Sequence, residues 1–246
     1  MESAVYAGDF RISYYDLDMR GSLKLSALMR MIHVAADVNA ASFGVGYTDL
    51  SNLNMTFVLQ KIGFKFLRTP RYSETVRIRT WPSEISKGTF LRLGDMYDAD
   101  GNKLIEWASL WILFDLENRK ILKPNKLPVN IPEMGCLGVE VMPEKIVLAD
   151  DAKTPFSTHT HHVRYADVDT NIHMNNSIYG DLIGNAVFLA EANLKHPDFR
   201  KVYINYLSEA RFGECIDISA TDYEDAVIVA GESNKRKTFC AKLVKA

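Results

Sequence analysis

The chain repeats a short pattern of one tyrosine and two aspartates, and this repeat constrains the fold more than any other feature. The segment Ile12–Asp18 (ISYYDLD) aligns with Val163–Asp169 (VRYADVD), and further along the chain residues 62–74 align without gaps on residues 202–214. A chain of 246 residues is long enough for two domains of ordinary size. The repeat therefore predicts one structural unit built twice.

Each copy predicts the same order of elements. Apolar residues recur at helical spacing from Leu25 to Ala36 in the first copy and from Tyr179 to Ala190 in the second. Alternating apolar residues and turn signals then predict strands near 75–81, 89–98, 104–114, 214–221, 225–231 and 238–244. Each copy is thus predicted to be an α+β unit, with a short lead strand, one long helix and an antiparallel sheet that wraps the helix. Two such units in one chain predict a fused dimer.

The stretch between the copies predicts a linker. Residues 129–153 contain Pro132, Gly135, Gly138 and Pro143 and have weak periodicity, so they are not expected to form regular structure. We therefore predict an N-terminal domain over 1–128 and a C-terminal domain over 154–246.

The two copies differ most at polar positions. The second copy has Asp169, Asn171 and His173 where the first has Asp18, Arg20 and Ser22, and it has Glu209 in the predicted sheet where the first has Thr69. Around the start of the second helix the polar residues are Asp169, Asn171, His173, Asn175 and Asn176. Because a duplicated enzyme often keeps its chemistry in one copy, we expect the active site in the second.

The segment Asp169–Tyr179 resembles the D-x-N-x-H-x-N-N-x-x-Y signature of the acyl-acyl carrier protein (acyl-ACP) thioesterases of plants and bacteria. In the first copy, Ala108–Asp115 with Arg119, Lys120 and Pro124 is similar to the A-S-x-W segment of this family and its sequel. The resemblance covers nearly the whole chain, except the linker and the last strands. It implies two tandem hotdog domains that form a fused pseudo-dimer, with a degenerate N-terminal domain that sets acyl-chain specificity and a catalytic C-terminal domain.

Thioester hydrolysis requires a base or nucleophile and a group that stabilises charge on the carbonyl oxygen. Glu209 is the candidate for the first role, because a carboxylate in an apolar sheet environment can acquire a raised pKa, and the resemblance supports the same position. The candidates for orienting water and the thioester are Asn171 and His173, with Asp169 fixing the loop. The start of the helix is the candidate oxyanion hole, with Asn175 and Asn176 before it.

A thiol mechanism beside Glu209 is excluded, because the position that holds a cysteine in plant relatives is Ala210 here. We expect Cys215 and Cys240 to be small buried residues and His33 to belong to a core. His159, His161 and His162 are not expected to bind a metal, because strand alternation places His162 on the opposite face and no further ligand completes the set. No cofactor is expected.

The bulk composition excludes some classes of partner. With 29 basic and 31 acidic residues, the net charge of −2 gives no strong field for nucleic acid or an anionic membrane. No apolar run approaches the ~20 residues of a membrane-spanning helix, and the first residues do not resemble a signal or transit peptide. We therefore expect a cytoplasmic protein.

The first hypothesis is hydrolysis of fatty acyl-ACP to free fatty acid and carrier, with the acidic carrier protein as partner. Two alternatives stay open at this stage, an acyl-CoA thioesterase and a non-catalytic acyl-binding hotdog module. The sequence determines neither the preferred length and saturation of the acyl chain nor whether two copies pair into a homodimer.

Overall fold

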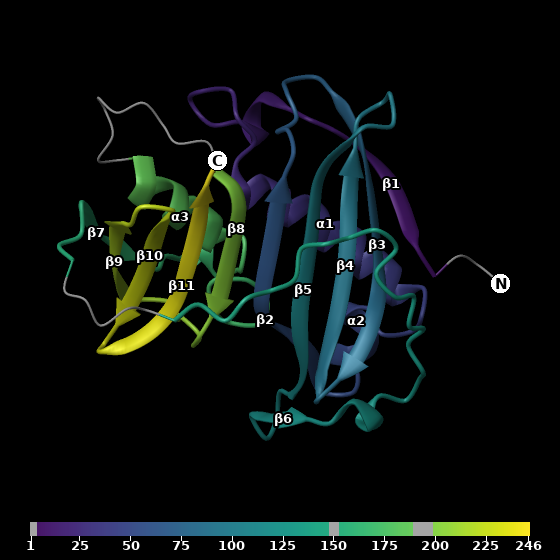
Figure 1. Cartoon of the computed structure of the whole chain (residues 1–246). Helices are drawn as coiled ribbons and strands as arrows, with labels where there is room; N and C mark the ends of the chain where they lie inside the picture. Colours follow the sequence, from purple (N-terminus) through teal and green to yellow (C-terminus); the bar gives the residue numbers. More distant parts are fainter. Residues whose placement is uncertain (1–3, 148–152, 189–198) are drawn as a thin grey trace. The chain divides into compact units, whose positions relative to one another are not determined.

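The computed structural model describes residues 4–147, 153–188 and 199–246, and it divides into two compact units (Figure 1). Unit 1 comprises Met1–Leu23 and Arg30–Pro143, and unit 2 comprises Lys24–Met29 and Glu144–Ala246. Among the residues described, no helix has the length and apolar character needed to cross a membrane.

Unit 1 contains one antiparallel sheet. Its strands are β1 (Tyr6–Arg11), β2 (Met55–Phe66), β3 (Thr75–Ser86), β4 (Thr89–Tyr97) and β5 (Lys103–Asp115), in the order β1-β3-β4-β5-β2, and the short β6 (Lys120–Leu122) pairs with β5. Its helical segments are the 3₁₀ turns Tyr14–Asp16 and Pro124–Lys126, the short α2 (Tyr47–Ser51), and most of the long α1 (Leu25–Ala41).

Unit 2 repeats this arrangement. Its strands are β7 (Ser157–His162), β8 (Phe199–Tyr206), β9 (Cys215–Asp222), β10 (Ala226–Ser233) and β11 (Arg236–Lys245), in the order β7-β9-β10-β11-β8. Its helical segments are the 3₁₀ turn Tyr165–Asp167 and α3 (Ile178–Phe188). The predicted lead strand, long helix and antiparallel sheet are therefore confirmed in both copies, except that Ala190, predicted as part of the second helix, lies outside the described residues.

The helix of unit 1 packs on the inner face of its sheet because its apolar positions recur on one side. Ile32 and Ala35 are buried, and the His33 ring contacts Trp111 of β5 edge-on at 5.8 Å between ring centroids. Asn39 accepts a hydrogen bond of 2.8 Å from Arg92 of β4. Burial lowers the pKa of Arg92 to about 10, since the charged guanidinium lies between helix and sheet.

In unit 2 the first turn of α3 packs against the first turn of α1, which clusters with this unit. Gly180 is required at this contact, because a Cβ there would lie 2.6 Å from the backbone nitrogen of Ser26. The Ser26 hydroxyl donates a hydrogen bond to the Asp181 carboxylate. The Tyr179 ring contacts Phe239 of β11 edge-on at 5.1 Å.

The predicted linker, of which residues 148–152 lie outside the described residues, packs against the strands. The indole nitrogen of Trp81 donates to the Gly135 carbonyl at 3.0 Å, and the buried Glu106 carboxylate accepts the backbone N–H groups of Glu140 and Val141. In unit 2 the Asn205 amide donates to the Glu144 carbonyl and accepts the N–H of Ile146. Backbone groups without a strand partner are thus satisfied by side chains of the sheets.

Candidate active site

The signature loop of unit 2 is ordered by the Asp169 carboxylate. One carboxylate oxygen accepts the backbone N–H of Asn171 at 2.8 Å, and the other accepts the side-chain amide of Asn175 at 3.1 Å. The Asp169 backbone N–H donates to the His173 carbonyl at 3.1 Å, which closes the loop. Asp169 therefore fixes the loop, as expected, and its oxygens already have donors.

The Asn175 side chain forms a turn with Ser177 just before the helix that follows. Its oxygen accepts the N–H of Ser177 at 2.9 Å and the Ser177 hydroxyl at 2.8 Å. The N–H of Asn175 itself donates to the Asp167 carbonyl at 2.8 Å. The N–H of Asn176, in contrast, has no hydrogen-bond partner among the described residues. Of the two predicted oxyanion residues, Asn176 is thus the one whose backbone donor is available.

Glu209 does not lie in a strand, and this part of the prediction is wrong. Strand β8 ends at Tyr206, and Glu209 belongs to the loop that follows. Its side chain is 32% exposed and accepts a hydrogen bond of 3.3 Å from Arg211. A carboxylate in this loop is the group that can accept a proton or attack a carbonyl.

A backbone hydrogen bond joins the Glu209 loop to the signature loop. The N–H of Met174 donates to the Ala210 carbonyl at 2.8 Å. The bonded residues are the direct neighbours of His173 and Glu209, so these two side chains start from adjacent backbones. The structure thereby brings the signature residues and Glu209, which are distant in sequence, to one place in unit 2.

The corresponding loops of unit 1 repeat backbone hydrogen bonds of unit 2 but carry different side chains. The Asp18 carboxylate accepts the N–H groups of Arg20 and Ser22, each at 2.9 Å. The Ile12 N–H donates to the Glu74 carbonyl at 2.8 Å, as the Val163 N–H donates to the Glu214 carbonyl at 2.9 Å in unit 2. The difference between the copies is therefore one of side chains on a shared frame.

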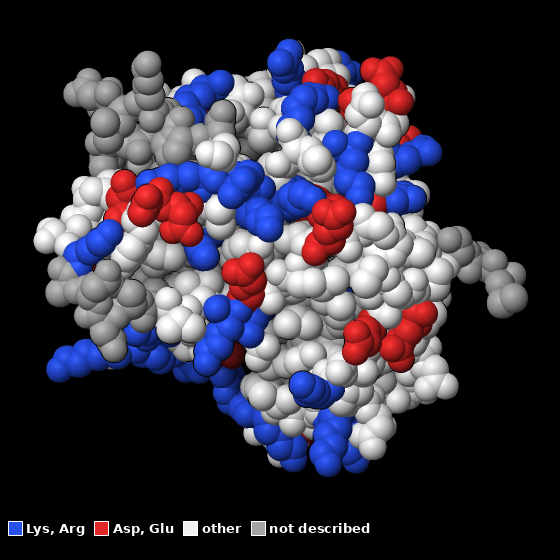
Figure 2. Space-filling view, viewed as in Figure 1, with Lys and Arg blue, Asp and Glu red and all other residues white. Residues whose placement is uncertain are grey.

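The β10–β11 hairpin borders the Glu209 loop. The N–H of Ser208 donates to the Thr238 carbonyl at 3.2 Å, and the Ser208 hydroxyl donates to the Lys237 carbonyl at 2.7 Å. Residues 234–237 are exposed, and Lys and Arg side chains gather at the end of this hairpin, at the lower left of the view in Figure 2. The candidate site is thus flanked by a basic hairpin.

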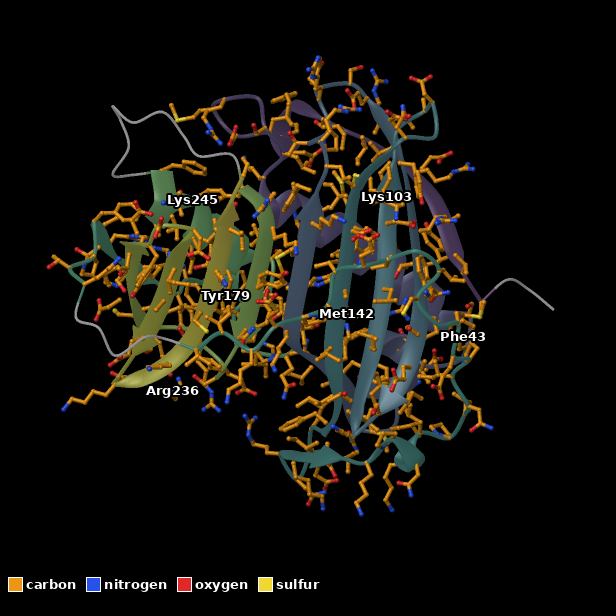
Figure 3. The ribbon with its side chains drawn as sticks, in the orientation of Figure 1. Phe43, Lys103, Met142, Tyr179, Arg236 and Lys245 are labelled. Atoms are coloured by element: carbon orange, nitrogen blue, oxygen red, sulfur yellow. The ribbon has the colours of Figure 1, made fainter. Side chains whose placement is uncertain are left out.

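Sequence analysis assigned no role in the site to Tyr179, which is buried, or to Tyr206, which is half-buried. The Tyr206 hydroxyl donates to the Asn176 carbonyl at 3.2 Å, and its ring contacts Tyr179 edge-on at 5.2 Å. Tyr179 and Arg236, both labelled in Figure 3, belong to this unit, and Arg236 bonds the Glu214 carboxylate at 3.0 Å. Burial raises the pKa of both tyrosines, so both stay neutral. The only signal in the sequence was the final tyrosine of the signature.

The histidines of β7 alternate as predicted. His159 and His161 are partly buried and His162 is exposed. Within the described residues, no group of three or more histidine, cysteine, aspartate or glutamate side chains could hold a metal ion. Cys240 is buried as expected, but Cys215 is exposed, so that prediction is wrong. Cys215 opens β9 beside the edge strand β7, where its sulfur lies 3.1 Å from Nδ1 of His162.

Models of protein families match both copies. The acyl-ACP thioesterase N-terminal domain matches residues 3–126, and the acyl-ACP thioesterase C-terminal domain matches residues 150–242. The chain belongs to the acyl-ACP thioesterase family. It is a hydrolase of acyl-ACP thioesters. The comparison with curated protein sequences gave no match.

Solved structures show the same fold over the full length of this thioesterase. An acyl-ACP thioesterase from Bacteroides thetaiotaomicron has a TM-score of 0.84 at 21% identity and covers 99% of this chain and 98% of its own. A putative oleoyl thioesterase from Lactobacillus plantarum has a TM-score of 0.80 at 23% identity, with 98% and 96% covered. The 12:0-ACP thioesterase from Umbellularia californica has a TM-score of 0.81 at 17% identity, with 100% and 98% covered. The predicted tandem hotdog fold is confirmed.

Replacing Cys136, Cys215 and Cys240 together is expected to leave most turnover of this thioesterase intact. Ala210 stands beside Glu209, so no thiol is available at that position. Serine at the buried position 240 costs stability, because it buries a hydroxyl, and alanine is the milder choice there. The measurement is kcat on acyl-ACP for a variant whose fold is verified by circular dichroism. A large loss of kcat in that folded variant would contradict the prediction.

Proposed function

We propose that this thioesterase hydrolyses fatty acyl-ACP in its C-terminal unit, with Glu209 as base or nucleophile. One observation carries the proposal, the Met174 to Ala210 backbone bond that joins the signature loop to the Glu209 loop. The N-terminal unit has the same frame but has Thr69 at the position of Glu209. We therefore assign the chemistry to residues 154–246 and acyl-chain specificity to residues 1–128.

Two routes are open to the Glu209 carboxylate. As a base it takes a proton from water, whose oxygen attacks the thioester carbon, and the thiol leaves after receiving that proton. As a nucleophile it attacks the carbon itself, the C–S bond breaks, and the thiolate leaves and takes a proton from solvent. Water then hydrolyses the acyl anhydride that remains. A single turnover in ¹⁸O-labelled water identifies the second route when water attacks the anhydride at the Glu209 carbon, because the fatty acid then keeps an unlabelled oxygen from the carboxylate and the label enters Glu209.

The backbone N–H of Asn176 is the proposed donor to the carbonyl oxygen. The Tyr206 hydroxyl holds the Asn176 carbonyl, and the Asn175 side chain bonds Ser177 just before the helix, so this donor is fixed before the substrate binds. A fixed donor in a partly buried site stabilises the charge that develops on the oxygen. Asn171 and His173 are proposed to orient water and the thioester on the loop that Asp169 orders.

Carrier-protein substrates are expected to be preferred over acyl-CoA, and the preference is expected to weaken as salt is added. The carrier is acidic, and exposed cations near the candidate site attract it over a distance that salt shortens. The measurement is kcat/KM for acyl-ACP and acyl-CoA of matched chain length at low and high ionic strength. Equal values for both substrates under both conditions would contradict this prediction.

Two further expectations remain predictions, a cytoplasmic location and the absence of nucleic-acid partners. Whether two copies pair into a homodimer is left open by the sequence. Sedimentation of the purified chain over a range of concentrations would establish the oligomeric state.

A further inference from the structure

We infer that the β10–β11 hairpin is the docking site for the acidic surface of the acyl carrier protein. The inference rests on the proposed function and adds the place at which the partner binds. Lys235, Arg236 and Lys237 are consecutive in sequence and all exposed. Arg236 is engaged by the Glu214 carboxylate, whereas no carboxylate among the described residues forms an ion pair with Lys235 or Lys237. These two lysines are the cations that a partner can pair with.

The backbone of the turn is a second, independent observation. Asn234 and Lys235 have φ values of 50° and 63°, as both central residues of a tight two-residue hairpin turn must. Glycine is favoured at the second of these positions, and the β3–β4 turn has it, with Lys87 followed by Gly88 at φ 84°. Lys235 thus occupies a left-handed position that glycine would fill with less strain. Left-handed backbone at a residue with a Cβ is strained, and such strain is often found at ligand-binding sites, so we associate it here with a use for the Lys235 side chain.

The corresponding hairpin in unit 1 has the opposite charge. Strands β4 and β5 occupy the same places in unit 1 as β10 and β11 in unit 2, and their connection contains Asp98 and Asp100. In unit 1 the cation that pairs with this connection is Arg68, in the loop after β2, which bonds Asp98 at 3.4 Å. Because both copies fold in the same way, the fold does not require a basic hairpin. The basic charge belongs to the copy that carries Glu209.

The hairpin also lies where a carrier protein would have to bind. Ser208, next to Glu209, bonds the backbone of Lys237 and Thr238. A carrier held by Lys235 and Lys237 would therefore present its acyl arm beside the Glu209 loop. Complementary charge at such a place speeds association more than it changes the chemical step.

The test reverses charge in matched pairs. The double variant Lys235→Glu/Lys237→Glu is compared with Lys123→Glu/Lys126→Glu, which changes net charge equally at two exposed lysines of unit 1. At low ionic strength we expect kcat/KM for acyl-ACP to fall about tenfold or more in the hairpin variant, with a weaker dependence on salt. Hydrolysis of the acyl-N-acetylcysteamine thioester, which has no carrier, is expected to stay unchanged.

A second variant separates docking from folding. Lys235→Gly removes one cation and relieves the left-handed backbone, so its melting temperature is expected not to fall. Its kcat/KM for acyl-ACP is still expected to fall severalfold, since one steering charge is lost. Full acyl-ACP activity in this variant and in the double variant would overturn the inference.

Three other outcomes would also overturn it. If the hairpin variant lost as much kcat/KM with the carrier-free thioester as with acyl-ACP, the lysines would act in catalysis. If the unit 1 control lost as much kcat/KM for acyl-ACP as the hairpin variant, the effect would be one of net charge. A matching loss with acyl-phosphopantetheine would show that the hairpin binds the phosphate of the arm and not the protein surface. Failure of the parent enzyme to hydrolyse acyl-ACP would instead contradict the proposed function.

Discussion

Replacing Glu209 with glutamine is expected to remove most hydrolysis by the folded enzyme. Glutamine has nearly the same volume and keeps an oxygen that accepts a hydrogen bond from Arg211. It cannot accept a proton or attack a carbonyl as a carboxylate does, so the loss should appear in kcat rather than in substrate affinity. A general base typically contributes ~10²–10⁴ in rate. The measurement is kcat with saturating acyl-ACP.

The other copy supplies the control. Adding Thr69→Glu to the Glu209→Gln variant is expected to restore nothing, because Arg20 and Ser22 stand where Asn171 and His173 are needed. A kcat of Glu209→Gln within a factor of about three of the parent, far below the expected loss, would exclude Glu209 as base or nucleophile. Asp169 would then be the remaining carboxylate of the signature, although both of its oxygens already accept hydrogen bonds.

Replacing Asp169 with alanine is expected to reduce both kcat and stability. The substitution removes the acceptor for the Asn171 N–H and for the Asn175 amide, so the signature loop and the helix start lose their shared anchor. Losing two such bonds costs about 1–3 kcal/mol of unfolding free energy. A displacement of the reacting groups by about 1 Å costs on the order of 10² in rate. Thermal unfolding and kcat on acyl-ACP measure the two effects.

Asp18→Ala is the matched variant in unit 1. Asp18 also accepts two hydrogen bonds, from the Arg20 and Ser22 N–H groups, and the first of these corresponds to the Asn171 bond of Asp169. Its loss should therefore lower stability by a similar amount. Its kcat is expected to stay close to that of the parent, because unit 1 lacks the proposed catalytic side chains. The role given to Asp169 would be untenable if Asp18→Ala lost as much kcat as Asp169→Ala.

The duplicated frame explains why such paired tests are available. The hydrogen bonds that close the loop in unit 2 recur in unit 1, and the strands follow the same order in both. A stability effect should therefore appear in both copies, whereas an effect on chemistry should appear only in unit 2. Each pair of variants therefore separates an effect on stability from an effect on chemistry within the same fold.

The sequence by itself determined the repeated unit, the order of its elements and the signature. These features are encoded locally, since helical and strand periodicity depend on neighbouring residues. The bounds of strands were less predictable where the pattern breaks. Strand β3 continues to Ser86 beyond the predicted end at 81, because a register shift between Pro82 and Glu84 accommodates the proline in the sheet.

Only the tertiary structure decided how the site is assembled. The sequence predicts Glu209 in the sheet, but the chain leaves β8 at Tyr206 and the Ala210 carbonyl bonds Met174 instead. The tertiary structure also decided the roles of the two asparagines. The Asn175 amide bonds Asp169 and Ser177, whereas the N–H of Asn176 is left available. Contacts between loops have no periodicity in sequence. They are determined by which backbone donors and acceptors remain after the strands and helices have formed their own bonds.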